Sequence, residues 1–442
     1  MLTPGRLACV VLLVSCSYAA GGQTSATDAV VLPSATGQQT ETDEYTRYEL
    51  LDPTSASFRI TYEVTATTAG ARFFYNPIRK GSVASDESVT DAMTGRPLKF
   101  EGVHGADARK DPLMEKAEAD TDYIKVTLAR PVPEHGQARM VIRKTYKNQK
   151  SYFVEGGEVV FNRPLGIRRN KIVLPPGYEV TGLTVPSQIL MEPDGRLAVS
   201  FLHAGAGESP LVLRGVKDAQ TGAKATPAGE RKSWEAPFAG LPERERLSER
   251  AHQDRDIVYF LQQPETHSFS LYHDYTETRP GVNAYANVVR AGSKASAPSA
   301  YVLDTGEKLP TRVMTGAEMA AATPKLNAGE DVDAKAEVVV IPFAAVKAGE
   351  SLRLRIAETY TAPASYRLEG GAGDSLQAEE FVFDRSLGRP RNAVVLPAGW
   401  YCTTSATPAT VTRMEDGRVR LEFWDGAPEA VDVLVKGRRR VK

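Results

Sequence analysis

The amino-acid sequence contains the same segment twice. Residues 159–178 and 381–400 are identical at eleven of twenty positions at a spacing of 222 residues. Weaker matches, at slightly different spacings, extend the repeat upstream and downstream. The folding unit is therefore predicted to occur twice, as copy 1 at residues 46–216 and copy 2 at residues 256–438. Each copy is long enough to bury a core of its own, unlike the short units of a solenoid.

Both copies have the sequence pattern of β-strands. Phe58, Ile60 and Tyr62 alternate with polar residues, so that one face of an extended chain would be buried. Asp-Gly pairs at 194–195 and 416–417 are typical of hairpin turns, because these residues accept the positive φ that such turns need. Many short strands separated by turns predict an all-β fold: two tandem homologous β-sandwich domains produced by an internal duplication.

The segments outside the two copies differ from them in composition. Residues 17–45 are rich in Ser, Thr, Gly and Gln, and we expect a flexible tether. Residues 217–255 are polar and highly charged, which indicates a linker, and the stretch 241–252 favours a short helix. The basic residues 439–442 are expected to form a solvated tail.

The first residues have the pattern of an export signal. Arg6 precedes an apolar run, 7–14, that is too short to span a bilayer but suits a secretory signal. Residues 13–16 (Leu-Val-Ser-Cys) resemble a bacterial lipobox, in which the signal peptide (1–16) is cleaved just before Cys16 and the lipidated Cys16 becomes the new N-terminus. Small residues also permit ordinary cleavage near 19–20. We expect a periplasmic or outer-membrane lipoprotein held to the membrane only by this lipid, or alternatively a secreted soluble protein.

Charge and missing motifs argue against several classes of function. Lys and Arg (54) nearly balance Asp and Glu (55), so the net charge is −1 and no global field attracts nucleic acid. The sequence lacks the zincin H-E-x-x-H motif, the nucleophile elbow and the glycine-rich phosphate loops. We therefore predict no catalytic residue, cofactor or metal. These absences do not bear on an enzyme with scattered catalytic residues, such as the carboxylates of a glycosidase.

Residues that recur in both copies are the first candidates for a site. Arg163 and Asn170 of copy 1 correspond to Arg385 and Asn392 of copy 2, and each pair flanks a Leu-Gly turn before a predicted strand. An arginine fork and an asparagine amide suit anionic or sugar ligands. The same residues could instead cap the turn and form structural ion pairs, since residues kept in both copies are most simply determinants of the fold.

Copy 2 has further aromatic residues near predicted strand ends. Trp400 and Tyr401 follow one predicted strand, and Trp424 and Asp425 end another. Exposed aromatic rings beside a carboxylate would form a binding surface for sugar rings. The alternative is that these rings belong to an aromatic core.

The organisation is loosely similar to β-sandwich modules that accompany secreted bacterial hydrolases, including the N-terminal sandwiches of some metallopeptidases. This resemblance concerns architecture and transfers no site residues. The leading hypothesis is an envelope lipoprotein that acts as a non-catalytic binding or scaffolding module for a glycan or a protein partner. Two copies would raise avidity for a repetitive polymer. The alternatives are a secreted hydrolase of glycans or peptides, with its site in copy 2 or between the copies, and an assembly partner that uses a sheet edge.

Overall fold

The computed structural model describes residues 38–440 except for 206, 218–248, 291, 330, 371–378 and 428–429. The predicted signal with Cys16, and most of the predicted linker helix, lie outside the described residues. The described chain is mainly β-strand, with two short helices, α1 (Gly105–Ala108) and α2 (Gly316–Ala320). Neither of these helices has the length or hydrophobicity needed to cross a membrane.

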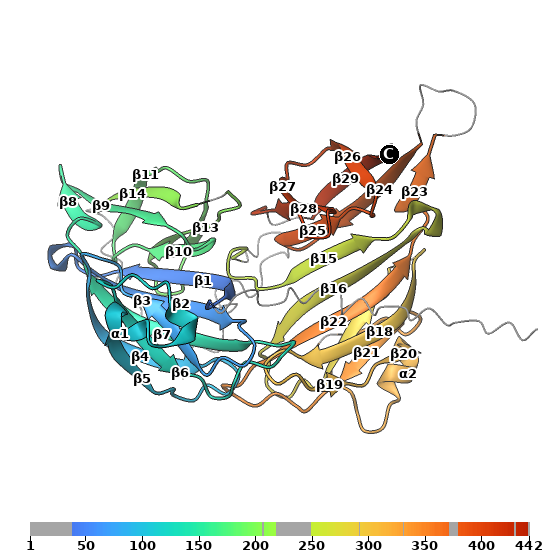
Figure 1. The fold of residues 1–442 in the computed structure, drawn as a ribbon, viewed down its shortest axis with the longest axis horizontal. Helices are drawn as coiled ribbons and strands as arrows, with labels where there is room; N and C mark the ends of the chain where they lie inside the picture. The colour runs from blue at the N-terminus through green and yellow to red at the C-terminus, as the bar shows by residue number, and fades with distance from the viewer. Residues whose placement is uncertain are drawn as a thin grey trace, which may run out of the picture.

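Copy 1 consists of three sheets around one main hydrophobic core (Figure 1). The sheets have the strand orders β12-β13-β10-β1-β2-β7-β4, β11-β14-β9-β8 and β3-β6-β5. The strands are β1 (Glu41–Leu50), β2 (Ser57–Ala66), β3 (Phe73–Pro77), β4 (Val83–Asp91), β5 (Phe100–His104), β6 (Asp122–Thr127), β7 (Ala138–Lys147), β8 (Tyr152–Glu155), β9 (Glu158–Leu165), β10 (Arg169–Val173), β11 (Tyr178–Leu183), β12 (Gln188–Met191), β13 (Leu197–Leu202) and β14 (Ser209–Lys217).

Copy 2 repeats this arrangement strand for strand, with β19 as an addition at one edge. Its sheets have the orders β27-β28-β25-β15-β16-β22-β18-β19, β26-β29-β24-β23 and β17-β21-β20. The prediction of an all-β chain with two similar tandem halves is confirmed. The strands are β15 (Asp256–Leu261), β16 (Ser268–Glu277), β17 (Ala284–Val288), β18 (Lys294–Val302), β19 (Lys308–Leu309), β20 (Arg312–Thr315), β21 (Glu337–Pro342), β22 (Leu352–Thr361), β23 (Tyr366–Glu369), β24 (Glu380–Leu387), β25 (Arg391–Val395), β26 (Trp400–Ser405), β27 (Thr410–Arg413), β28 (Val419–Trp424) and β29 (Val431–Arg439).

Two predicted terminal segments belong to the sheets. β1 starts at Glu41, so residues 41–45, predicted as part of the tether, belong to a strand that pairs with β2 at Glu41, Thr42 and Tyr45. The polar residues among them do not show the alternation typical of a strand, although Tyr45 is buried beside β10. At the other end Arg439 belongs to β29, and its guanidinium lies 4.6 Å from the ring centroid of Trp400.

Equivalent aromatic residues form the centres of the two cores. Phe58 and Phe161 of copy 1 meet edge to face, with ring centroids 5.3 Å apart and an angle of 84°. Their equivalents Phe269 and Phe383 meet at 5.6 Å and 90°. All four side chains are completely buried. Burial of each contributes roughly 1.5–3 kcal/mol to the free energy of unfolding, so both copies have a core of their own.

A buried polar contact and backbone hydrogen bonds join the two copies. The guanidinium of Arg139 in copy 1 donates to both carboxylate oxygens of Asp304 in copy 2, at 2.8 and 2.7 Å. The backbone N–H of Gln137 donates to the carbonyl oxygen of Leu303 at 2.9 Å. A Cβ at Gly136 would lie 2.4 Å from that same oxygen, so only glycine permits this close approach.

Residues 249–255, which we call the strap, run between the copies and contact both. Glu249 accepts a hydrogen bond from the hydroxyl of Tyr45 in copy 1 at 2.7 Å. The equivalent arginines Arg169 and Arg391 donate to backbone carbonyls of the strap, at 3.1 and 2.6 Å. This end of the predicted linker is therefore fastened to both copies rather than free in solvent.

Candidate functional site

The predicted site arginines lie inside the two sandwiches. The guanidinium carbon of Arg163, on β9, is 5.5 Å from the ring centroid of Phe58. That of Arg385, on β24, is 5.3 Å from the ring centroid of Phe269. Burial is the main cause that lowers the pKa of both groups. In this structure both guanidinium groups therefore contact aromatic rings of the core, and they present little surface to a ligand.

Two buried groups of opposite charge occupy equivalent positions on β7 and β22. The ammonium of Lys144 in copy 1 donates to Asn76 at 2.5 Å. In copy 2 the carboxylate of Glu358 accepts from Asn287 at 2.8 Å. Burial lowers the pKa of Lys144 to about 7 and raises that of Glu358. An asparagine amide serves either charge because it presents an oxygen to one and an N–H to the other.

The predicted site asparagines cap the turns that precede β10 and β25. The side-chain amide of Asn170 donates to the carbonyl oxygen of Ile167 at 2.6 Å. Asn392 makes the same contact with the carbonyl oxygen of Arg389 at 2.7 Å. Both side chains are buried. These contacts are those of turn caps, which is the structural alternative raised by the duplication.

The structure does not bring the four predicted residues of copy 2 together. Trp400 and Tyr401 lie on β26, which pairs with β29, whereas Trp424 and Asp425 lie at the end of β28, in another sheet. Trp400 is only 2% exposed, and its indole N–H donates to Gln263 at 3.1 Å. Trp400 is therefore part of the core, which is the alternative stated for these rings, and the four residues do not form one surface in this structure. Tyr401 is exposed on its own.

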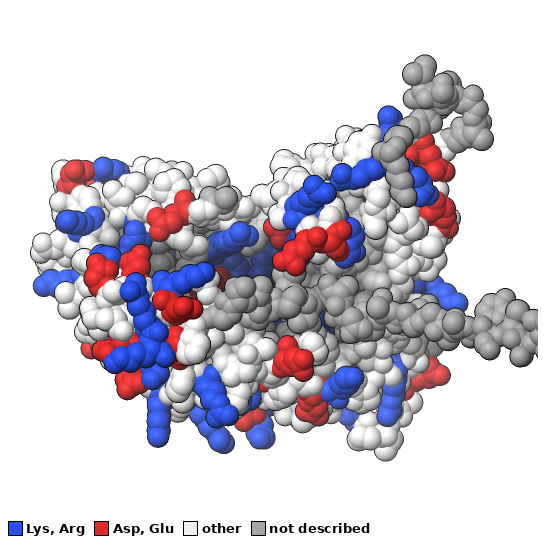
Figure 2. Space-filling view, in the orientation of Figure 1, with Lys and Arg blue, Asp and Glu red and all other residues white. Residues whose placement is uncertain are grey.

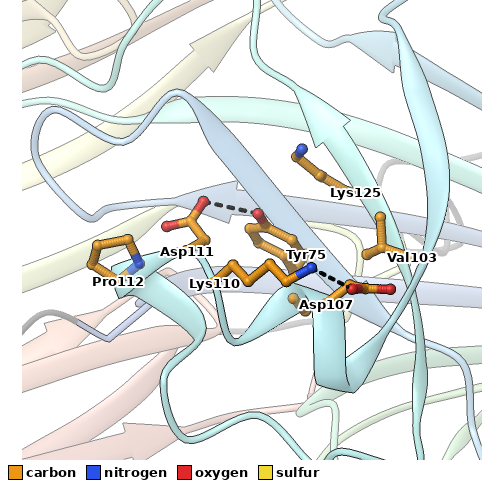
Figure 3. A pocket seen from close by; sticks show the side chains of 8 residues that line it. Tyr75, Val103, Asp107, Lys110, Asp111, Pro112 and Lys125 are labelled. Atoms are coloured by element: carbon orange, nitrogen blue, oxygen red, sulfur yellow. Dashed lines mark hydrogen bonds and ion pairs between the residues drawn. The ribbon is translucent and has the colours of Figure 1, made fainter.

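A pocket of about 490 Å³ lies in copy 1, at the sheet β3-β6-β5 (Figure 3). Helix α1 and the short 3-10 turn Pro112–Met114 close it on one side. Figure 3 shows that polar groups from the sheet and from these turns face the same space. The lining residues are Tyr75, Val103, Asp107, Ala108, Lys110, Asp111, Pro112 and Lys125.

The polar groups of this pocket are arranged in pairs. The Tyr75 hydroxyl donates to Asp111 at 2.8 Å, and burial followed by this carboxylate raises the pKa of the phenol. The ammonium of Lys110 lies 2.8 Å from Asp107 and lowers the pKa of that carboxyl. The ammonium of Lys125 donates to Glu101 at 2.9 Å and stands over the ring of Phe73, 4.5 Å from its centroid. The pocket thus offers a hydroxyl, carboxylates and ammonium groups side by side.

Copy 2 lacks this chemistry at the equivalent positions. The register of β3 with β6, and of β17 with β21, places Ala286 where copy 1 has Tyr75, and Val340 where it has Lys125. Ala286 and Val340 are buried in an apolar cluster with Met319. An alignment of the two copies could have located the pocket from sequence, because it shows polar residues in copy 1 where copy 2 has apolar ones.

His273 on β16 is buried, and we expect it to make the stability of the fold sensitive to acid. Burial, reinforced by Arg255 and Arg389, lowers its pKa to about 3, whereas an unfolded histidine has a pKa near 6.5. Between these values the unfolded chain binds a proton that the folded chain does not, so acidification favours unfolding. We expect this group to reduce the free energy of unfolding by at most about 1.4 kcal/mol per pH unit as pH falls from 6.5.

Urea unfolding between pH 4 and 7 tests this prediction. His273→Phe should lose less stability on acidification than the wild type, whereas His135→Phe, at an exposed position, should retain the wild-type pH dependence. Equal pH profiles for all three proteins would contradict it.

The described residues contain no group of three or more His, Cys, Asp or Glu side chains placed to hold a metal ion.

No known family model and no curated protein matches the sequence. Solved structures with some likeness include an M1 zinc metallopeptidase from Deinococcus radiodurans bound to a Tyr-Ser-Ala substrate (TM-score 0.27, 10% identity, 40% of this chain and 42% of that chain). An aminopeptidase N family protein from Idiomarina loihiensis has a TM-score of 0.22 and 8% identity, over 41% of this chain and 29% of that one. This chain thus spans less than half the length of either protein, and likeness at this level shows neither the fold nor the function of this chain.

Proposed function

We propose that this protein is exported to the bacterial cell envelope, where it binds a glycan without cleaving it. The export signal predicted at residues 1–16 supports the location, and we propose Cys16 as the lipid attachment site. The single observation that carries the binding proposal is the pocket of copy 1. Its hydroxyl, carboxylate and ammonium groups can exchange hydrogen bonds with sugar hydroxyls, and Val103 and Pro112 can contact the apolar face of a sugar ring.

The charge state of the pocket favours binding over hydrolysis. A glycosidase needs a carboxyl group of raised pKa that can donate a proton to the leaving group. Lys110 lowers the pKa of Asp107 instead. Asp111 accepts hydrogen bonds from the Tyr75 hydroxyl and from the backbone N–H of Leu113, as its turn requires. The Asp107 carboxylate is thus paired with an ammonium rather than poised as an acid, and Asp111 serves as a hydrogen-bond acceptor.

Removal of the pocket ammonium tests this proposal. Lys125→Met should weaken binding of an envelope glycan by about tenfold, because a hydrogen bond to a charged group is lost. Lys99→Met, at an exposed position of the same copy, serves as the matched control and should bind as the wild type does. Calorimetry on the chain without residues 1–20, against neutral envelope glycans, measures both. Equal affinities for the two variants would contradict a glycan site in this pocket.

A further inference from the structure

Four arginines gather where the strap meets the facing turns of the two copies. Arg168 comes from the turn before β10 in copy 1, and Arg389 from the equivalent turn before β25 in copy 2. Arg250 and Arg255 come from the strap between them. Figure 2 shows a hollow between the two upper lobes, which carry β11 and β14 on one side and β27 and β28 on the other in Figure 1, with Lys and Arg side chains deep inside it.

Arg250 contacts both copies and therefore lies at the centre of the junction between them. Its backbone N–H donates to the side chain of Gln188 in copy 1 at 2.9 Å, and its Nη1 to the carbonyl oxygen of Gly388 in copy 2 at 3.5 Å. Its Nη2 lies 3.8 Å from Asp425. Arg250 is only 4% exposed, yet Nε and Nη2 have no hydrogen-bond partner among the described residues. Two buried donors therefore remain available.

Arg168 and the turn that carries Arg389 reach Asp425 from the two copies, and Arg255 lies over the ring of Tyr275, 4.5 Å from its centroid. The guanidinium of Arg168, which is exposed, lies 5.5 Å from the ring centroid of Trp424, the neighbour of Asp425. The backbone N–H of Asp425 donates to the carbonyl oxygen of Pro390 at 2.8 Å, directly after Arg389. Trp424 and Asp425 thus connect the copy 1 arginine to the copy 2 turn.

Positive charge at this junction is not balanced. Within the described residues, Asp425 is the only carboxylate at ion-pair distance from any of the four arginines. Glu44 is near enough to Arg168 for a long-range interaction but forms no ion pair with it. Burial, then repulsion from Arg255 and Arg250, lowers the pKa of Arg389. A chain with a net charge of −1 thus concentrates cations in one hollow.

We infer that this arginine cluster is a second binding site, which takes an anionic group, a carboxylate or a phosphate, carried by a glycan. The planar fork of a guanidinium matches the paired oxygens of both groups. The indole of Trp424 provides an apolar surface for an adjacent sugar ring. The inference goes beyond the proposed function, because the pocket of copy 1 needs no charge on its ligand, and this site lies between the copies.

Two substitutions with opposite expected effects test the inference. Arg168→Gln removes an exposed cation and should weaken binding of polygalacturonate, a carboxylate polymer, by about tenfold. Asp425→Asn removes the competing carboxylate, keeps an acceptor oxygen, and should strengthen binding several-fold. Arg59→Gln, at an exposed position on β2, is the control and should leave affinity unchanged. Binding to the wild type should weaken as salt is raised from 20 to 300 mM, because exposed charges are screened.

The choice of probe separates the two sources of anionic oxygen. Inorganic phosphate and polygalacturonate are titrated in parallel with neutral dextran. Binding of either anion that Arg168→Gln weakens and Asp425→Asn strengthens supports the site. The anion that binds more tightly shows whether the site prefers phosphate or carboxylate. Affinities that are the same in all three variants, or no binding of either anion at 20 mM salt, would overturn the inference. Neither result affects the test of the copy 1 pocket, which uses neutral glycans and Lys125→Met.

Discussion

Replacement of Asp304 by alanine is expected to lower the free energy of unfolding by about 3–5 kcal/mol. The Asp304 side chain is completely buried and receives both hydrogen bonds of the Arg139 fork. Without this carboxylate the guanidinium of Arg139 stays buried between the copies with its charge uncompensated, and that penalty is larger than the net value of the intact pair. The same change should loosen the junction between the two copies.

Urea unfolding followed by circular dichroism measures this loss. Asp194→Ala is the matched control, because it breaks the exposed pair of Asp194 with Arg196 and should cost no more than about 1 kcal/mol. The double variant Arg139→Met/Asp304→Leu, which removes both charges and keeps the volume, should regain most of the stability. An Asp304→Ala protein as stable as Asp194→Ala would show that the pair does not join the copies.

Replacement of Trp400 by alanine is expected to cost about 3–5 kcal/mol, as for other large aromatic residues deleted from a core. The Trp400 ring packs against Phe381 at 5.5 Å between centroids, and its N–H is satisfied by Gln263. Trp424 is only partly buried and lies under the exposed Arg168. Trp424→Ala should therefore cost about 1 kcal/mol, close to the loss of one cation–π contact.

Thermal and urea unfolding of the two tryptophan variants distinguish a core residue from a surface residue. The expected order is a large loss for Trp400→Ala and a small one for Trp424→Ala. Similar losses would mean that the two rings have similar surroundings, as they would in one exposed aromatic surface.

The strand pattern and the duplication were sufficient to predict the architecture. Alternation at Phe58, Ile60 and Tyr62 corresponds to β2, and the Asp-Gly pairs at 194–195 and 416–417 lie in the turns β12–β13 and β27–β28. Residues 41–45 were missed because their strand is set by pairing with β2 and, at Tyr45, with β10, more than a hundred residues away. Local pattern does not carry that information.

The candidate sites depended still more on contacts between distant segments. The burial of Trp400 follows from Phe381 and Gln263, and nothing in its local sequence distinguishes it from the partly exposed Trp424. The arginine cluster is assembled from two turns and the strap, so no local motif marks it. The pocket was different, since Tyr75 and Lys125 replace apolar residues of copy 2. That contrast is visible in an alignment of the two copies.

The central claim, that the pocket of copy 1 binds a glycan and leaves it intact, is tested most directly by one incubation with two readouts. The chain without residues 1–20 is mixed with each envelope glycan, and both the bound glycan and newly formed reducing ends are quantified over time. We predict saturable binding that Lys125→Met weakens and Lys99→Met does not, with the glycan recovered at its original length. Reducing ends that accumulate in proportion to the wild-type protein would contradict the claim and identify a hydrolase.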